Sequence, residues 1–285
     1  MKLQIVGDEV QDKSEGKAFE QSIAVIGAGN MGGAIVRGLL RAGCPADKLA
    51  ILESSREKAQ MVAADSGVRV LDEARELSGY DLIVLAVKPQ VLPEVSLNIA
   101  AVLPKSEKRI IVSIAAGVPL DAISDLFQGK GQAVRVMPNL PCAVFEGVSA
   151  VYSEDHAAGD IAEKVFSTVG ETVRLPSEDL FDVVTALSGS GPAYVFLMIE
   201  ALADGAVKHG LSRAMATKLA AQTMRGAAGL LLQSGECPGA LREKVASPGG
   251  TTIYGLQALE DSGVRAALMR AVEAATWRSS EMSRM

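Results

Sequence analysis

Three hydroxyl side chains and two glycines stand together in the segment Ser247-Pro248-Gly249-Gly250-Thr251-Thr252, between stretches with helical patterns. Glycines accept left-handed backbone conformations, so successive N–H groups can converge on one point, and the N-terminus of a following helix favours negative charge there. The segment therefore predicts a cradle for a small anion such as a carboxylate. An ordinary turn between two helices with a threonine cap uses the same residue types, and the segment alone does not decide between them. The candidate anion ligands are Ser247, Gly249, Gly250, Thr251 and Thr252.

A second glycine-rich segment, near the start of the chain, has the spacing Gly-x-Gly-x-x-Gly. Residues 22–26 have the pattern of a short buried strand, and apolar positions with helical spacing follow the last glycine. In a strand, loop and helix of this kind the first glycine makes a tight turn, the second lets the backbone approach a pyrophosphate, and the third lets the helix pack on the strand. The segment predicts a dinucleotide site in a Rossmann fold. Its candidate contacts are Ile26, Gly27, Ala28, Gly29, Asn30, Met31 and Gly32.

The end of the second predicted strand, residues 49–53, bears on which dinucleotide binds. Glu53 lies about 20 residues after the glycine loop, where an acidic side chain holds the ribose hydroxyls of NAD. Ser54, Ser55 and Arg56 follow directly, and two hydroxyls with one guanidinium would instead suit the 2′-phosphate of NADP. We favour NADPH with these three residues as ligands, on the expectation that Glu53 turns toward solvent, and NADH stays open.

Three later predicted strands end in residues suited to the nicotinamide half of the cofactor. Lys88 is expected to hydrogen-bond the nicotinamide ribose, although a surface lysine with its stem packed on apolar groups has the same sequence context. Ala115 and Ala116 follow the predicted strand 109–114 and leave space for the ring, and Asn139 can bond its carboxamide. The candidate contacts are Ala86, Val87, Lys88, Pro89, Ala115, Ala116 and Asn139.

The histidines are few, which bears on the type of substrate. A dehydrogenase that reduces a carbonyl must protonate a developing alkoxide and usually supplies a His, Lys or Tyr for this. The chain has two histidines, His156 and His209, and both stand at predicted helix ends with a structural interpretation. An imine nitrogen can arrive already protonated, so an imine substrate places a milder demand on the site.

Composition excludes several classes of protein. The chain has 285 residues, 48% of them hydrophobic, with a net charge of −6, which argues against nucleic acid as a partner. We expect no apolar stretch of membrane-spanning length without charges, and the acidic residues 1–21 lack the basic start and apolar core of a signal peptide, so a cytoplasmic location is predicted. Cys44, Cys142 and Cys237 are widely spaced, so no metal site or disulfide framework is expected.

The elements that must position these residues fall into two predicted domains. Short apolar runs alternate with helical patterns up to about residue 178, which is typical of parallel βαβ units in an α/β fold. Beyond it, long Ala- and Leu-rich segments predict an all-helical domain with more apolar surface than it can bury, and hence a homo-oligomer. The predicted strands are 22–26, 49–53, 68–71, 81–87, 109–114, 133–137, 147–152 and 172–175, and the helices include 193–208, 213–232 and 264–282.

We therefore predict an N-terminal extension, 1–21, whose composition favours disorder. A Rossmann dinucleotide-binding domain is expected at 22–178, and a helical domain for substrate binding and dimerisation at 179–285.

Taken together, these segments resemble the pyrroline-5-carboxylate reductase family. The resemblance runs from about residue 22 to the C-terminus, and the 247–252 loop is its most specific part. It implies reduction of 1-pyrroline-5-carboxylate to L-proline with NADPH or NADH, the last step of proline biosynthesis. The matching segments are the glycine loop, 86–89, 113–118, 137–139, 187–194, 200–204 and 247–252.

The resemblance also implies roles for individual residues. Ser247, Thr251 and Thr252 match residues that receive the substrate carboxylate, and Thr185 matches a residue near the ring nitrogen, so Thr185, Ser247 and Thr252 are the expected catalytic group. A dimer that often assembles into decamers is implied, in which the substrate loop of one subunit faces the cofactor of the other. Glu53 departs from the neutral residue that NADPH-using members often carry.

Two other classes remain as alternatives. The β-hydroxyacid dehydrogenases, which resemble this chain in domain order, carry a catalytic Lys four residues after the second Gly of a Gly-x-Gly, and this chain has Val195 there. Another imine oxidoreductase would share the same features. A dinucleotide-binding protein without catalysis would keep the first glycine loop but would not need the 247–252 segment.

Overall fold

The computed structural model describes residues 19–283 and divides into two compact units. A sheet unit contains 19–190 together with 273–283, and a helical unit contains 191–272. Most of the predicted N-terminal extension, 1–18, lies outside the described residues, whereas Phe19 is buried in a core of the sheet unit. The predicted domain boundary between residues 178 and 179 remains a prediction.

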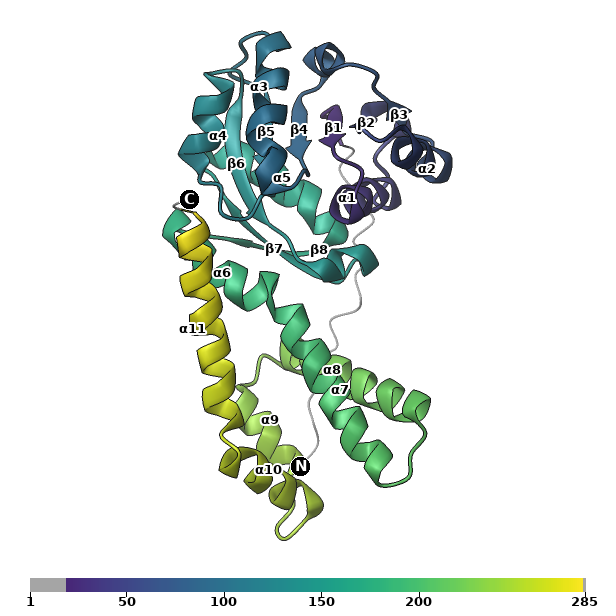
Figure 1. Ribbon diagram of the computed structural model, residues 1–285, viewed down its shortest axis with the longest axis vertical. Helices are drawn as coiled ribbons and strands as arrows, with labels where there is room; N and C mark the ends of the chain where they lie inside the picture. The colour runs from purple at the N-terminus through teal and green to yellow at the C-terminus, as the bar shows by residue number, and fades with distance from the viewer. Residues whose placement is uncertain (1–18, 284–285) are drawn as a thin grey trace. The chain divides into compact units, whose positions relative to one another are not determined.

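The sheet unit contains an eight-stranded sheet in the order β3-β2-β1-β4-β5-β6-β7-β8 (Figure 1). The first six strands in this order are parallel, and their order is that of a doubly wound dinucleotide-binding fold, which reverses direction between β1 and β4. The predicted Rossmann fold is therefore confirmed. The strands are β1 (Ile23–Ile26), β2 (Leu49–Leu52), β3 (Arg69–Val70), β4 (Leu82–Leu85), β5 (Ile110–Ser113), β6 (Gln132–Met137), β7 (Gly147–Tyr152) and β8 (Gly170–Arg174).

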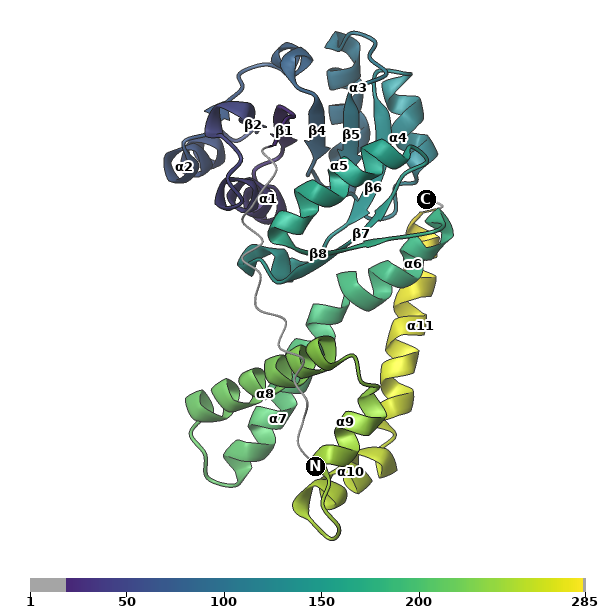
Figure 2. The same ribbon diagram turned by 180° about the vertical axis from the view of Figure 1, so that it is seen from behind.

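Helices cover both faces of the sheet, and each face has its own apolar core (Figure 2). Alternate residues of β1 supply the two cores, since successive side chains of a strand point to opposite faces: Ile23 and Val25 belong to one, Ala24 and Ile26 to the other. Helices α1 (Asn30–Arg41), α2 (Arg56–Ser66) and α5 (His156–Phe166) contribute to the first core, and α3 (Leu92–Val102) and α4 (Leu120–Phe127) to the second.

Two strands, β7 and β8, run against the expected direction. β7 is antiparallel to β6, whereas the alternating pattern predicted parallel units throughout this part of the chain. Residues 138–146 connect the two strands and hold only the short 3-10 helix η4 (Leu140–Val144). A parallel connection needs a crossover of a dozen or more residues, so this connection is too short for one.

A partly buried ion pair holds the segment after β8 to the sheet. The guanidinium of Arg135 in β6 donates to Glu178 Oε1 at 2.7 Å and lies over the ring of Phe181, 4.1 Å from its centre. The same carboxylate oxygen accepts from the amide of Leu120 at 2.7 Å, at the first turn of α4. Glu178 therefore joins β6, α4 and the short helices η6 (Glu178–Leu180) and α6 (Phe181–Val184) that lead toward Thr185.

The helical unit contains α7 (Gly191–Lys208), α8 (Arg213–Ser234), α9 (Pro238–Val245), α10 (Thr251–Asp261) and the first half of α11 (Val264–Met282). Its fully buried apolar residues are small, namely Ala203, Ala216 and Ala220. Its large apolar side chains are widely exposed, and those most exposed include Leu197, Leu232, Val245, Tyr254 and Met269. An exposed apolar surface of this extent is typical of a protein interface.

One helical segment, Glu178–Lys208, is long and apolar enough to cross a membrane by length and composition, with a mean hydropathy of 1.3 in its window. The expectation concerned apolar stretches without charges, and this segment contains charged residues, among them Asp182, Glu200 and Asp204, so it does not contradict that expectation. Only 11% of the most apolar 18-residue stretch of this segment is buried among the described residues.

Arg109 is a buried cation at the start of β5 that binds backbone carbonyls. It is 5% exposed, and its guanidinium donates to the carbonyl oxygens of Ser78, Tyr80, Pro104 and Lys130 at 3.0–3.4 Å. Burial lowers the pKa of this guanidinium, although nearby Asp81 opposes the effect. One side chain thus ties together the loops before β4, β5 and β6.

We expect Arg109→Met to lower the free energy of unfolding by roughly 2–4 kcal/mol, because four backbone carbonyls in part-buried hydrogen bonds lose their donor at once. Urea denaturation followed by circular dichroism measures this. Lys108→Met, an exposed neighbour, is the matched control and should change stability by less than about 0.5 kcal/mol. Equal effects of the two variants would contradict the role given to Arg109.

Candidate active site

The glycine loop has a separate steric role for each glycine. Gly27 has φ +95°, and a Cβ there would lie 2.8 Å from the carbonyl oxygen of Ala86. A Cβ at Gly32 would collide with the carbonyl oxygen of Gly27, so helix α1 can lie this close to β1 only with glycine there. At Gly29 a Cβ would meet nothing within 4 Å. The loop therefore turns tightly at Gly27, allows close packing of α1 at Gly32, and leaves open space at Gly29. The motif requires these three features for a pyrophosphate to bind.

Backbone hydrogen bonds place this loop where the strand order reverses. The amide of Gly27 donates to Leu52 at the end of β2, and the amide of Ala86 donates to Ile26 at the end of β1. Gly29 is the N-cap of α1 and provides no side-chain cap for the amides of Asn30, Met31 and Gly32 that follow. Uncapped amides at a helix N-terminus suit an anionic phosphate, so these residues fit the diphosphate of a dinucleotide.

Glu53 does not turn toward solvent. Its Oε2 accepts from the amide of Ala28 in the glycine loop at 2.8 Å, and its Oε1 accepts from the amide of Ser55 at 2.9 Å and from Ser54 Oγ at 3.2 Å. Partial burial raises the pKa of this carboxyl, but those hydrogen bonds and the charge of Lys58 outweigh it, so the pKa lies below its ordinary value. The expectation on which NADPH was favoured is therefore wrong.

The residues expected to bind a 2′-phosphate are partly engaged by the protein. Ser54 Oγ donates to Glu53, and Ser55 Oγ accepts from the amide of Lys58 at 3.4 Å as the N-cap of α2. Arg56 is exposed and makes no hydrogen bond or ion pair with any residue in 19–283. The structure thus places the three residues at one turn, but Ser54 and the amide of Ser55 bond the carboxylate of Glu53.

The remaining cofactor candidates lie just after β4, β5 and β6, along one edge of the sheet. Lys88 is exposed and is the N-cap of the short helix η3 (Pro89–Val91), while Ala86 and Val87 are half-buried. Ala115 is buried, with its amide bonded to Ser113 Oγ at 3.3 Å, and Ala116 is half-buried beside Gly117. The carboxyl ends of parallel strands are where ligands bind in such sheets.

Asn139 has both ends of its side-chain amide engaged by the protein. Its Oδ1 accepts from the amide of Val148 in β7 at 3.0 Å, and its Nδ2 donates to the carbonyl of Ser188 at 3.2 Å. Asn139 thus joins two segments that are far apart in the sequence. The residue stands at the expected sheet edge, but its hydrogen bonds support neighbouring backbone.

Thr185 opens a π-helical turn, Thr185–Gly189, which is bonded to Asn139 through Ser188. The wider turn is closed by the amide of Ser190 donating to the carbonyl of Thr185 at 2.8 Å. Gly189 faces Met137, and a Cβ there would lie 2.6 Å from the methyl group of that methionine. Turns of this kind inside helices are frequent at functional sites, and sequence patterns did not reveal this one.

The C-terminal helix α11 also contacts this part of the sheet unit. Ser279 in α11 is buried, and its Oγ donates to Asp182 Oδ1 at 2.6 Å. A Cβ at Gly117, after Ala115 and Ala116, would lie 3.6 Å from Ser283 Oγ. The last turn of α11 therefore packs beside the loop expected to hold the nicotinamide ring.

The 247–252 segment belongs to the helical unit and connects α9 to α10. Gly249 has φ +69°, the amide of Gly250 donates to the carbonyl of Ser247 at 3.0 Å, and Thr252 Oγ1 donates to the carbonyl of Val245 at 3.4 Å. The N-cap of α10 is Gly250, with no side-chain cap, so the segment is a turn between helices but not one capped by threonine. The first amides of α10 are left for another acceptor.

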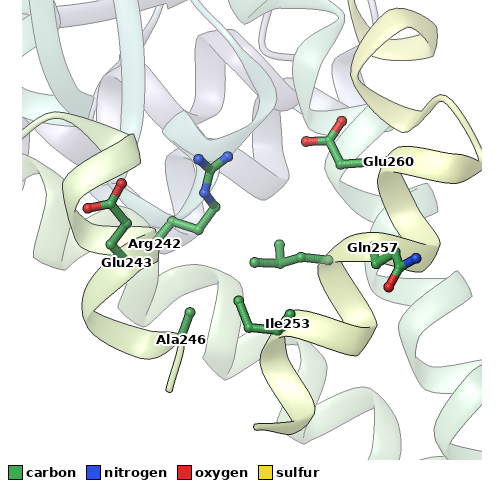
Figure 3. Close-up of a pocket in the computed structure, with 7 residues that line it drawn as sticks. Arg242, Glu243, Ala246, Ile253, Gln257 and Glu260 are labelled. Atoms are coloured by element: carbon green, nitrogen blue, oxygen red, sulfur yellow. The ribbon is translucent and has the colours of Figure 1, made fainter. Parts of the chain in front are cut away.

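A cavity of about 380 Å³ lies beside this loop, between α9 and α10 (Figure 3). Ala246 and Ile253, which flank the loop on either side, line it, and none of the predicted anion ligands does. Glu260 is paired with Arg265 at 2.6 Å, which lowers the pKa of its carboxyl. Sequence analysis did not single out this cavity. Its lining residues are Arg242, Glu243, Ala246, Ile253, Leu256, Gln257 and Glu260.

Family models match both parts of the chain. Residues 178–282 match the model for pyrroline-5-carboxylate reductase dimerisation, and residues 22–117 match that for coenzyme F420-dependent NADP oxidoreductases. The pyrroline-5-carboxylate reductase of Methanosarcina acetivorans is 42% identical over 93% of this chain and 98% of its own length. Pyrroline-5-carboxylate reductase 3 of Rattus norvegicus is 41% identical over 92% of this chain and 96% of its own.

Solved structures agree with these relatives. The structure of a pyrroline-5-carboxylate reductase from Coxiella burnetii matches with a TM-score of 0.88 and 33% identity, over 93% of this chain and 99% of that one. The Plasmodium falciparum pyrroline carboxylate reductase with NADP bound matches with a TM-score of 0.81 and 31% identity, over the same shares of the two chains. This chain is therefore an oxidoreductase with a nicotinamide dinucleotide cofactor and belongs to the pyrroline-5-carboxylate reductase family.

Proposed function

We propose that this chain reduces 1-pyrroline-5-carboxylate to L-proline, the last step of proline biosynthesis. The observation that carries the proposal is the match to relatives of this name over more than nine-tenths of the chain. A bound NADPH or NADH supplies the hydride. The protein's own task is to orient the dinucleotide and the imine relative to each other. Such orientation of the reactants lowers the activation barrier of the hydride transfer.

The sheet unit is the proposed site of the dinucleotide. The open space at Gly29 and the uncapped first turn of α1 support a diphosphate there. Lys88, Ala115 and Ala116 stand along the same sheet edge and are proposed for the nicotinamide half. For Asn139 the proposed part is indirect, because its side-chain amide already holds the turn that contains Thr185.

The 247–252 loop is the proposed receiver of the substrate carboxylate. The amides at the start of α10 and the hydroxyls of Ser247, Thr251 and Thr252 supply donors, and Gly249 and Gly250 let the backbone approach an anion. Thr185 is the proposed neighbour of the ring nitrogen. These assignments follow the family resemblance and the local geometry of each loop.

The proposed reaction does not need a strong acid from the protein. A protonated imine accepts hydride at carbon and becomes a neutral amine, so hydroxyls, amides and water are sufficient around it. The positions of both histidines agree with a reaction that needs no histidine. His156 is exposed at the start of α5, and His209 is exposed just beyond the end of α7. A β-hydroxyacid dehydrogenase is less well supported, since Val195 lies in α7 where that class carries its lysine.

We further propose that the chain works as a cytoplasmic homo-oligomer, a dimer or a decamer, assembled through the helical unit. The exposed apolar side chains of α7, α8, α10 and α11 and the match to a dimerisation family model support this. The apolar segment Glu178–Lys208 falls within the matched region, so we assign its exposed surface to subunit contacts and not to lipid.

The reaction can be tested directly with purified protein. Addition of 1-pyrroline-5-carboxylate is expected to cause loss of absorbance from NADPH or NADH, with formation of proline in equal amount. A β-hydroxy acid with the oxidised dinucleotide is the control and should give no reaction. A folded protein that binds dinucleotide but turns over neither substrate would support a binding role without catalysis.

Gly29 and Gly32 provide a test of the dinucleotide site. Gly29→Ala should keep the melting temperature within about 2 °C, because the added methyl group meets open space, but should weaken dinucleotide binding at least about tenfold by occupying the place of the pyrophosphate. Gly32→Ala should lower the melting temperature clearly, because its methyl group collides with backbone. Thermal denaturation and calorimetric titration measure the two effects. Unchanged binding by Gly29→Ala would argue against this site.

Thr252 provides a test of the carboxylate loop. Thr252→Val should raise KM for 1-pyrroline-5-carboxylate about tenfold, because it removes the hydroxyl that we propose turns from the carbonyl of Val245, 3.4 Å away, to the carboxylate when substrate binds. The dinucleotide Kd should stay nearly unchanged. Steady-state kinetics and titration measure the two constants. Ser262→Ala, which removes a hydroxyl bonded to Ala258 at the far end of α10, is the control for general effects on this helix. Equal loss of substrate and cofactor affinity would indicate a structural role for Thr252.

A further inference from the structure

The carboxylate of Glu53 lies between two backbone segments of the proposed dinucleotide site. One is the glycine loop, through the amide of Ala28, and the other is the turn into α2, through the amide of Ser55. A side chain bonded at both oxygens to two different segments has little freedom to rotate. Glu53 is therefore a built part of this site, and the inference that follows rests on the proposed function.

The bonding of Glu53 leaves room for a neutral sugar. A carboxylate offers about four acceptor positions, and three hydrogen bonds from protein occupy them here, counting Ser54 Oγ. One position remains for a hydroxyl donor. The second strand of a dinucleotide fold brings its terminal acidic residue to the adenosine ribose, whose 2′- and 3′-hydroxyls are such donors.

The same bonding disfavours a phosphate on that sugar. The donors that could receive a 2′-phosphate, Ser54 Oγ and the amide of Ser55, already donate to Glu53. The carboxylate is ionised, and a phosphate placed beside it meets a like charge, which is unfavourable at this range. To admit the phosphate, Glu53 would have to give up its hydrogen bonds to the turn.

Two cations near this turn would instead favour a 2′-phosphate. Arg56 is exposed, and its guanidinium is not held by an ion pair among residues 19–283, while Lys58 is close enough to influence Glu53. Exposed charges of this kind are screened by salt and contribute little. Glu53 has the advantage because it is anchored by backbone amides within the site.

We propose that Glu53 makes this chain select NADH over NADPH, by accepting a hydrogen bond from the adenosine ribose and by excluding a 2′-phosphate. This reverses the preference that the sequence favoured. Ser54 and Ser55 then serve to hold the carboxylate, and Arg56 is not required for binding.

Calorimetric titration of the full chain with NAD⁺ and with NADP⁺ tests the proposal without catalysis. The unsubstituted protein should bind NAD⁺ at least about tenfold more tightly than NADP⁺. Glu53→Gln, which removes the charge and keeps the shape, should weaken NAD⁺ and tighten NADP⁺, moving the ratio of the two Kd values about tenfold or more. Glu57→Gln removes an equal charge from the exposed first turn of α2 and should leave the ratio within about twofold.

The outcomes separate the inference from the proposed function. Tighter binding of NADP⁺ by the unsubstituted protein, or equal changes for both dinucleotides in Glu53→Gln, would overturn the inference and leave the reductase proposal intact. Absence of binding of either dinucleotide by folded protein would overturn both. Should Glu53→Gln fail to fold, the ratio of the Kd values for NAD⁺ and NADP⁺ is compared between the unsubstituted protein and Arg56→Ala. A preference for NAD⁺ that is unaltered in Arg56→Ala supports the inference. A preference of the unsubstituted protein for NADP⁺, with about tenfold selective loss of NADP⁺ binding in Arg56→Ala, refutes it.

Discussion

The close approach of helix α1 to strand β1 is the constraint on which the sheet unit depends. It requires Gly32, where any side chain would collide with the carbonyl of Gly27. The amide of Gly27 is in turn bonded to the end of β2, and that of Ala86 to the end of β1. The first turn of α1 is thereby held at the point where the strand order reverses, and its uncapped amides follow Gly29, where we propose that the diphosphate binds. A loop with larger residues would lose both the packing and the space.

Glu53 extends this arrangement from the diphosphate toward the sugar. Its carboxylate bonds the glycine loop to the start of α2, so two neighbouring turns of the sheet edge are joined through one ionised side chain. The hydrogen bonds that keep its pKa low also keep it charged near neutral pH and fixed in position. Local backbone amides thus fix a flexible glutamate in the position from which we propose that it distinguishes NADH from NADPH.

The helical unit is organised on a different principle. Its buried side chains are small alanines, while large apolar side chains such as Leu197, Leu232 and Met269 remain exposed. Each exposed apolar side chain of this size forgoes roughly 1.5–3 kcal/mol that burial would contribute, so the unit gains much from association. The family match over 178–282 is named for dimerisation, which agrees with a unit whose core is completed by another copy.

Much of the fold could be predicted from the sequence because its signals are local. Each of the eight strands lies within two residues or so of its predicted place, since short apolar runs bounded by turn residues are recognisable without tertiary information. The glycine loop could be interpreted in the same way, because the backbone conformation of Gly27 and the contact at Gly32 follow from the spacing within one βα unit.

Features that join distant residues were decided only by the tertiary structure. The direction of β7 depends on which strand lies beside it, and the role of Asn139 depends on its bonds to Val148 and Ser188. The orientation of Glu53 depends on the amide of Ala28, 25 positions away in the chain. Sequence by itself determined which residues could do chemistry and in which elements they lie. Which hydrogen bonds they make was decided by the packing of separate elements, because a polar side chain near a sheet edge takes the partners that the fold brings within reach.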